Sequence, residues 1–227
     1  NLNGYTLTGH ITVNNLNNVS LTFTLCGDTT QPDSNIENGG NVFTGKGSGL
    51  AVGNQTNNTN TKDHVTVKLQ DVILDGFGGN AVVFSSWGKL VAQNVTFSNN
   101  RCASTQGRGA AIGFSGAGTL VADNCKFTNN SLANGYGGAG YLVSSTNDEK
   151  AESSNNYGSY DAVLQNNTFE NNTAYSQGGA MYMNPSAITV TTLLDQCTFT
   201  NNSTTTAGGG AVYNNQGSLT LGTGNLF

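Results

Sequence analysis

Charged residues are scarce in this chain of 227 residues: they make up 9% of it, and the net charge is −5. Proline and methionine occur only twice each. Disordered chains are rich in Pro, Lys and Glu, and helical bundles in Ala, Leu, Glu and Lys, so this composition excludes both classes. No apolar run approaches the roughly 18–20 residues of a membrane span. The abundance of Gly, Asn and Thr, together with Val, Phe and Tyr, is typical of β-strands joined by polar turns.

The balance of charges also limits the classes of partner. Only 8 Lys and Arg stand against 13 Asp and Glu, and without a basic patch we expect no nucleic-acid partner. The low charge favours an extracellular or cell-surface location. Because the chain begins at Asn1 and not at Met, we expect a fragment or trimmed part of a longer surface protein.

One phrase recurs along the chain: a Phe followed by Asn three positions later. Successive copies are 30, 42 and 30 residues apart. We predict that the Phe rings stack inside the molecule, and that each Asn occupies a tight turn with left-handed dihedral angles and forms an amide ladder with its neighbours. The members of this structural ladder are Phe97, Phe127, Phe169, Phe199, Asn100, Asn130, Asn172 and Asn202.

A second phrase, Gly-Gly-Ala followed by an apolar residue, alternates with the first. Its Ala residues also recur at about 30 residues, and the longest interval falls at the same place. Both phrases therefore belong to one repeated unit, and we expect a loop insertion of about twelve residues at about 144–160. The Ala positions are Ala51, Ala81, Ala111, Ala139, Ala180 and Ala211.

A period near 30 with strand-forming residues predicts a parallel β-helix. Propeller blades need about 40–50 residues, and leucine-rich repeats need their Leu pattern. In a β-helix, each repeat makes one coil, and coils stack at the inter-strand spacing of about 4.8 Å. Gln, Asp and Asn fill the two positions before the last strand of each unit, which predicts a polar corner between strands. We therefore expect an all-β, single-stranded parallel β-helix of about seven coils spanning 1–227.

The same alignment places three tyrosines in one column. Tyr141, Tyr182 and Tyr213 follow the Ala of successive copies by two positions, on the face opposite the buried one. Stacked at about 4.8 Å, they would form an exposed aromatic strip that holds sugar rings or a partner protein. The alternative is a ladder covered by the loop at 144–160, which also carries Tyr157 and Tyr160.

Two carboxylates are the best candidates for catalysis. Asp123 and Asp195 share a column two coils apart, about 9.6 Å in backbone terms, near the separation of about 6.5–9.5 Å in inverting glycosidases. No third carboxylate joins them, so a polar turn is the favoured interpretation. His10 and His64 lie far apart in the repeat register. We predict no catalytic residue, no metal site and no cofactor.

A loop cluster of Asp148, Glu149 and Glu152 could hold Ca²⁺, but its spacing is not that of a known calcium loop. A solvated loop is the favoured interpretation.

The four cysteines have no metal-binding spacing. Cys125 and Cys197 share a column, but a gap of two coils exceeds the limit of about 7 Å between Cα atoms of a disulfide. Cys102 with Cys125 is the more plausible pair, and buried free thiols are equally compatible with the sequence. Neither the state of Cys26 nor glycosylation of the Asn-x-Ser/Thr triplets follows from the sequence.

The alternating Gly-Gly-Ala and Phe-x-x-Asn motifs resemble the passenger domains of the polymorphic outer-membrane protein family of chlamydiae. The match covers roughly 67–215. This resemblance implies a right-handed β-helix displayed on the cell surface as an adhesin, with a receptor on a host or neighbouring cell, or a glycan, as partner. Two alternatives stay open: a filament subunit that associates end to end, and a carbohydrate-active enzyme, either a polysaccharide lyase or a glycoside hydrolase.

Overall fold

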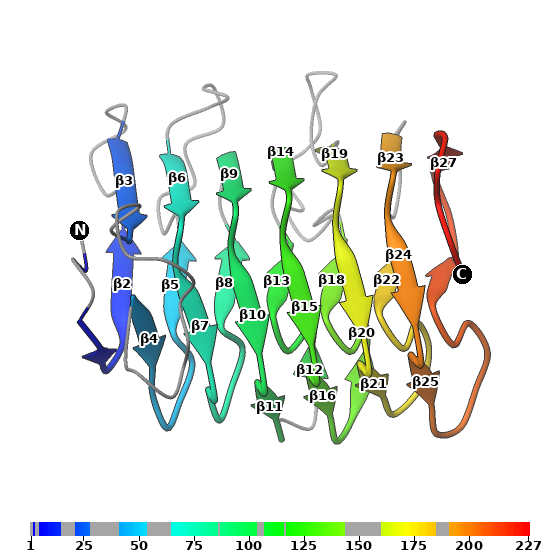
Figure 1. Ribbon diagram of the computed structural model, residues 1–227, viewed down its shortest axis with the longest axis horizontal. Coiled ribbons are helices and arrows are strands. Elements are labelled where there is room, and N and C mark those ends of the chain that lie inside the picture. The colour runs from blue at the N-terminus through cyan, green and yellow to red at the C-terminus, as the bar shows by residue number, and fades with distance from the viewer. Residues whose placement is uncertain are drawn as a thin grey trace, which may run out of the picture.

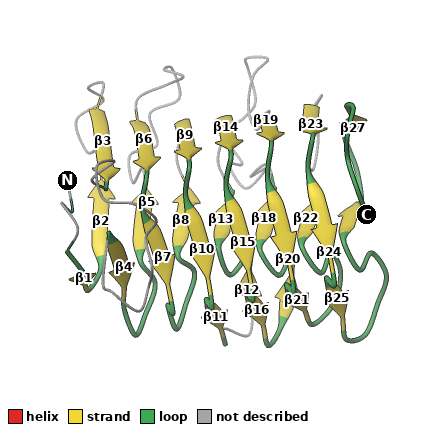
Figure 2. Cartoon of the chain, viewed as in Figure 1, coloured by secondary structure: helices red, strands yellow, loops and turns green. Residues whose placement is uncertain are grey.

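The computed structural model describes residues 2, 5–14, 21–27, 41–53, 65–85, 87–103, 107–115, 117–143, 160–184 and 191–227. All regular elements in these ranges are β-strands, and turns connect them (Figure 2). Several residues of the predicted sites lie outside the described residues: His64, Tyr157, Asp148, Glu149, Glu152 and most of the loop at 144–160.

Three long parallel sheets run the length of the molecule. Sheet A contains β1 (Leu7–Thr8), β4 (Val42–Thr44), β7 (Ile73–Asp75), β10 (Thr96–Ser98), β15 (Lys126–Thr128), β20 (Thr168–Glu170) and β24 (Thr198–Thr200). Sheet B contains β2 (Ile11–Asn14), β5 (Leu50–Gly53), β8 (Val82–Ser85), β13 (Ile112–Phe114), β18 (Gly140–Leu142), β22 (Met181–Met183) and β26 (Val212–Asn214). Sheet C contains β3 (Leu21–Cys26), β6 (Val65–Gln70), β9 (Trp87–Gln93), β14 (Ala117–Asp123), β19 (Tyr160–Gln165), β23 (Thr191–Asp195) and β27 (Ser218–Leu221).

Two short sheets lie between sheets A and B. Sheet D contains β11 (Arg101–Cys102), β16 (Ser131–Leu132), β21 (Thr173–Ala174) and β25 (Ser203–Thr204). Sheet E contains β12 (Gly107–Arg108) and β17 (Gly135–Tyr136).

The chain visits sheets A, B and C in turn and then begins the next coil, as the colours of Figure 1 follow from one end of the stack to the other. Each long sheet has seven strands over the described residues, so these make seven coils. The molecule is a right-handed parallel β-helix, which confirms the predicted fold class.

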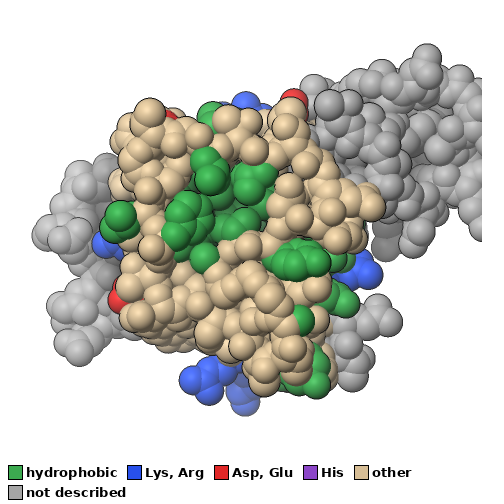
Figure 3. Space-filling view, turned by 90° about the vertical axis from the view of Figure 1, so that its right-hand side faces the viewer, with side chains coloured by type: hydrophobic (Ala, Val, Ile, Leu, Met, Phe, Trp, Pro, Cys, Tyr) green, Lys and Arg blue, Asp and Glu red, His purple; other side chains and the backbone are tan. Residues whose placement is uncertain are grey.

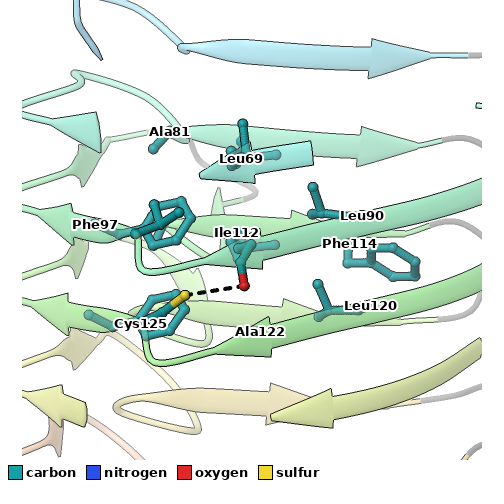
Figure 4. Packing of buried hydrophobic residues seen from close by; sticks show 14 of the residues in the cluster. Leu69, Ala81, Leu90, Phe97, Ile112, Phe114, Leu120, Ala122 and Cys125 are labelled. Atoms are coloured by element: carbon teal, nitrogen blue, oxygen red, sulfur yellow. Dashed lines mark hydrogen bonds between the residues drawn. The ribbon is translucent and has the colours of Figure 1, made fainter. Parts of the chain in front are cut away.

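The predicted Phe column is the centre of the core. Phe97, Phe127, Phe169 and Phe199 are buried and pair in register along sheet A. Their ring centroids lie 4.9, 4.6 and 4.7 Å apart with nearly parallel planes. Figure 4 shows Phe97 and its neighbours pointing into the interior between the sheets. Because the coil spacing of about 4.8 Å lies within the range of about 4.5–7 Å that centroids of offset-stacked rings prefer, a Phe in every coil can fill this column.

The predicted Asn ladder lines the corner that follows the Phe column. The Asn130 side-chain amide donates to Oδ1 of Asn172 at 2.9 Å and to the backbone oxygen of Phe97 at 3.0 Å. Asn172 repeats this pattern with Asn202 and Phe127, at 2.9 Å each. Each amide thus joins the coil before it to the coil after it, and no donor is left unpaired in a site from which water is excluded.

The left-handed dihedral angles, however, belong to a different Asn. The residue before each ladder Asn takes positive φ, between 55° and 57°, so the prediction for the ladder Asn itself was wrong. The two adjacent asparagines have different roles. The exposed one adopts the left-handed angles that turn the backbone, and the buried one forms hydrogen bonds between coils. The residues with positive φ at this corner are Asn99, Asn129, Asn171 and Asn201.

The Gly-Gly-Ala phrase forms the turn that enters sheet B. Gly137 and Gly178 have φ of 72° and 67°, where a side chain would be strained. A Cβ on Gly138 would lie 2.0 Å from the backbone oxygen of Gly179 in the next coil. The phrase at Ala51 was misplaced by two residues, because Ala51 pairs with Val83. The equivalent of Ala81 is Gly49, which lies 32 residues earlier, so the spacing of 30 did not apply to this interval.

All four cysteines are free thiols, and Cys102 does not pair with Cys125. The Cys125 thiol donates to the backbone oxygen of Ala92 at 3.5 Å, as the dashed line in Figure 4 marks. In the next coil Asn167 takes the same column and donates to the oxygen of Ala122 at 2.9 Å. Burial raises the pKa of Cys125 to about 12, so this thiol acts as a packed donor and not as a nucleophile.

We expect Phe127→Ala to lower the free energy of unfolding by about 3–5 kcal/mol, because it removes one ring from a buried stack. Lys126→Ala on the same strand is the control; its side chain is exposed, so its effect should stay within about 0.5 kcal/mol. Denaturant unfolding followed by circular dichroism measures both. Equal stability of the two variants would show that the Phe column does not hold the coils together.

Candidate functional site

Three tyrosines form a ladder on the outer side of sheet B. Tyr141 on β18, Tyr182 on β22 and Tyr213 on β26 pair in register. Their ring centroids lie 5.4 and 5.7 Å apart, with planes 10° and 5° from parallel. Met181 and Met183, which flank Tyr182 in the chain, point into the main core. The alternation along each strand therefore places the tyrosines outside that core.

The tyrosine ladder is nevertheless covered over most of its length, so the prediction of an exposed strip was wrong for two of its members. Tyr141 is 8% exposed and Tyr182 is 6% exposed. The Tyr136 ring lies 4.7 Å from that of Tyr182, tilted by 33°. The Arg108 guanidinium carbon lies 5.5 Å from the centre of the Tyr141 ring. These two side chains come from sheet E, which runs beside the ladder.

The local sequence explains why Arg108 reaches Tyr141. In the coil before Tyr141 the ladder position is Gly113, which has no side chain to cover the Tyr141 ring. Arg108 pairs with Tyr136 in sheet E, and each directly precedes the first Gly of its turn. This shared position before the Gly was the signal in the sequence. It was missed because Gln177 and Gly208 take the same position in the next two coils.

The stacking of the three rings limits which of their groups can contact a ligand. Tyr182 is the middle ring and has Tyr141 on one face and Tyr213 on the other, so a sugar cannot lie flat against it. Beside the ladder stand the exposed side chains of Arg108 and Tyr136, the latter 39% exposed, and Tyr213 at the end of the ladder is half-buried. Asn184 borders the ladder as a hydrogen-bond partner of Tyr182, and Asn215 donates to its Oδ1 at 3.0 Å. The site thus combines phenols, side-chain amides and one cation.

Burial raises the pKa of the Tyr141 phenol, and the Arg108 charge opposes part of that effect. Burial also raises the pKa of Tyr182, with smaller contributions from the neighbouring phenols. Both groups are therefore protonated hydrogen-bond donors at neutral pH.

The two candidate carboxylates have local partners. Asp123 accepts a hydrogen bond from the Asn166 amide at 3.0 Å. Asp195 accepts one from the backbone N–H of Thr223 at 2.8 Å and one from Gln165 at 3.4 Å. Both belong to the polar corner between sheets C and A, where they hold neighbouring coils together.

Other polar candidates are similarly placed. His10 bonds to the Ser48 backbone oxygen and to the Thr12 hydroxyl, each at 2.8 Å. Within the described part of the chain, His, Cys, Asp and Glu side chains form no group of three that could hold a metal ion. None of the described segments is a helix with the length and hydropathy that crossing a membrane requires.

The last coil exposes apolar side chains. Leu221, Leu226 and Phe227 are 53%, 65% and 63% exposed, and Figure 3 shows apolar atoms gathered in the middle of this face within a polar rim. Phe227 continues the ring column, 4.9 Å from Phe199. End-to-end association of chains stays a prediction.

A family model described as the right-handed β-helix region matches residues 63–226. No curated protein and no solved structure matches the chain. The likeness to polymorphic outer-membrane proteins therefore still depends on the motifs alone.

We expect a spectrophotometric titration of the native protein to show tyrosine ionisation above the ordinary value of about 10, and Tyr141→Phe and Tyr182→Phe each to reduce that late step. In the unfolded chain both phenols return to about 10. Above that pH the unfolded chain loses protons first, so stability should fall as pH rises through the native values. If neither variant changes the late step, the phenols of Tyr141 and Tyr182 are not buried, and the description of the ladder is contradicted.

Proposed function

Because the chain belongs to the right-handed β-helix family, we propose that it is a surface-displayed adhesin that binds a partner through its tyrosine ladder and carries out no catalysis. The partner is a receptor or a glycan on a host or neighbouring cell. The resemblance to autotransporter passenger domains motivates this location and role.

The ladder is the observation that carries the proposal. A β-helix needs apolar columns only toward its interior, yet here three stacked tyrosines run along an outer face. Tyrosine is enriched at the centres of binding interfaces, because one side chain offers apolar area and a hydroxyl group at low cost in entropy. The stack also fixes the hydroxyl groups before a partner arrives, which reduces the entropy lost on binding.

The carbohydrate-active alternative has less support. A hydrolase or lyase needs carboxylates that face the substrate and exchange protons with it. Asp123 and Asp195 accept hydrogen bonds from adjoining coils instead. The low charge suits an extracellular surface. The burial of Cys102, Cys125 and Cys197 keeps these thiols away from oxidants.

The triple variant Tyr141→Phe, Tyr182→Phe, Tyr213→Phe tests the proposal, because it keeps the stack and removes only the hydroxyl groups. We expect binding to a printed glycan array and to cultured cell monolayers to fall about tenfold or more, since a hydrogen bond contributes about 1 kcal/mol or more. The melting temperature should change little.

Tyr175→Phe is the matched control. Tyr175 is 43% exposed and outside the ladder, so its variant should bind like the wild type. Undiminished binding by the triple variant would remove the ladder from the function. If the protein released reducing ends or unsaturated products from a polysaccharide, and Asp123→Asn abolished this release, the protein would be an enzyme and the proposed function would be wrong.

A further inference from the structure

The exposed side of the tyrosine ladder carries a cation and an aromatic ring in adjacent coils. Arg108 and Tyr136 are register partners in sheet E, so their backbones lie about 4.8 Å apart. Arg108 contacts the ladder through Tyr141, and Tyr136 contacts it through Tyr182. Both side chains are exposed, and each contacts a buried ring of the ladder.

The Arg108 guanidinium lies over the Tyr141 ring, 5.5 Å from the ring centre. A guanidinium on an aromatic face can bind a carboxylate through two parallel hydrogen bonds. The described strands beside it, β12, β13, β17, β18, β22 and β26, contain no Asp or Glu. In a chain of net charge −5, this part of the surface therefore favours an acidic ligand.

The Tyr136 ring supplies an apolar surface next to that cation. One part of it packs against Tyr182 at 4.7 Å, and 39% of the residue stays exposed. A pyranose ring has an apolar C–H face that packs on an aromatic ring while its hydroxyl groups point to polar partners. The phenol groups of Tyr141 and Tyr182 add hydrogen-bond donors that stay protonated at neutral pH.

We propose that Arg108 and Tyr136 bind a carboxylate-bearing pyranose in a glycan chain, with the carboxylate on the guanidinium and the sugar ring on the exposed part of Tyr136. This inference rests on the proposed function and specifies its ligand. Uronic acids and sialic acids share this chemistry, and the two are separated by the choice of probe.

Isothermal titration calorimetry with two pairs of probes tests the proposal. The first pair is 3′-sialyllactose and lactose. The second is a tetragalacturonate and its methyl ester, in which the charged carboxylates are replaced by neutral esters. We expect at least one acidic probe to bind tenfold or more tightly than its neutral counterpart, and its affinity to fall as NaCl concentration rises.

Arg108→Gln should lower the affinity for that acidic probe tenfold or more, and Tyr136→Ala should lower it as well. Arg101→Gln is the matched control, because Arg101 is an exposed arginine on β11 in the same coil. Its variant should bind like the wild type. Circular dichroism melts of the three variants show whether the fold is retained, and Arg108→Lys separates charge from planar geometry by recovering only part of the affinity.

Three outcomes would overturn the assignment: equal affinity for acidic and neutral probes, wild-type affinity in Arg108→Gln, or binding of an acidic peptide where both acidic sugars fail. Binding of a neutral glycan or a protein that depends on the tyrosine hydroxyl groups would sink this assignment and leave the proposed function standing. No ladder-dependent binding to any cell or glycan would overturn both.

Discussion

The buried asparagine ladder is the interaction on which the rest of the structure depends. Strands of sheets A and B pair over only two to four residues, so the backbone alone gives little protection against a slip in register. Asn130 and Asn172 each bond to the coil before and the coil after through one side chain. A slip of one residue would leave these buried amides unpaired, which costs several hydrogen bonds in a site without water.

Because the strands pair in register, equivalent residues of successive coils line up in continuous columns. Once the corner is fixed, Phe rings follow one another in the core, and tyrosines follow one another on the outer face of sheet B. Differences between coils then create local chemistry. Gly113 leaves room above Tyr141, and Arg108 occupies it. The site is therefore the result of a regular scaffold and two exceptions in its repeat.

The sequence was sufficient to locate the columns that repeat, although it assigned the left-handed dihedral angles to the wrong Asn of each pair. The Phe and Asn columns, the polar corner and the tyrosine column all recur with the period of a coil, so alignment of the copies located them. It failed where the copies differ. Arg108 and Tyr136 share a position before the Gly of their turns, but Gln177 and Gly208 occupy it in the next two coils, so the alignment of the copies did not reveal that they cover the ladder. Ala51 was misaligned because the interval that ends at Ala81 is 32 residues long and begins at Gly49.

Native-state hydrogen exchange of the ladder amides tests the central claim most directly. The backbone N–H of Asn130 donates to Asn172 Oδ1 at 3.1 Å, and that of Asn172 to Asn202 Oδ1 at 3.0 Å. If the ladder fixes the register, these two amide protons should exchange only when the whole stack unfolds, and hence with the largest protection in the chain. Exchange as rapid as that of exposed turn residues such as Gln216 would contradict the account, because the corner would then open without loss of the fold.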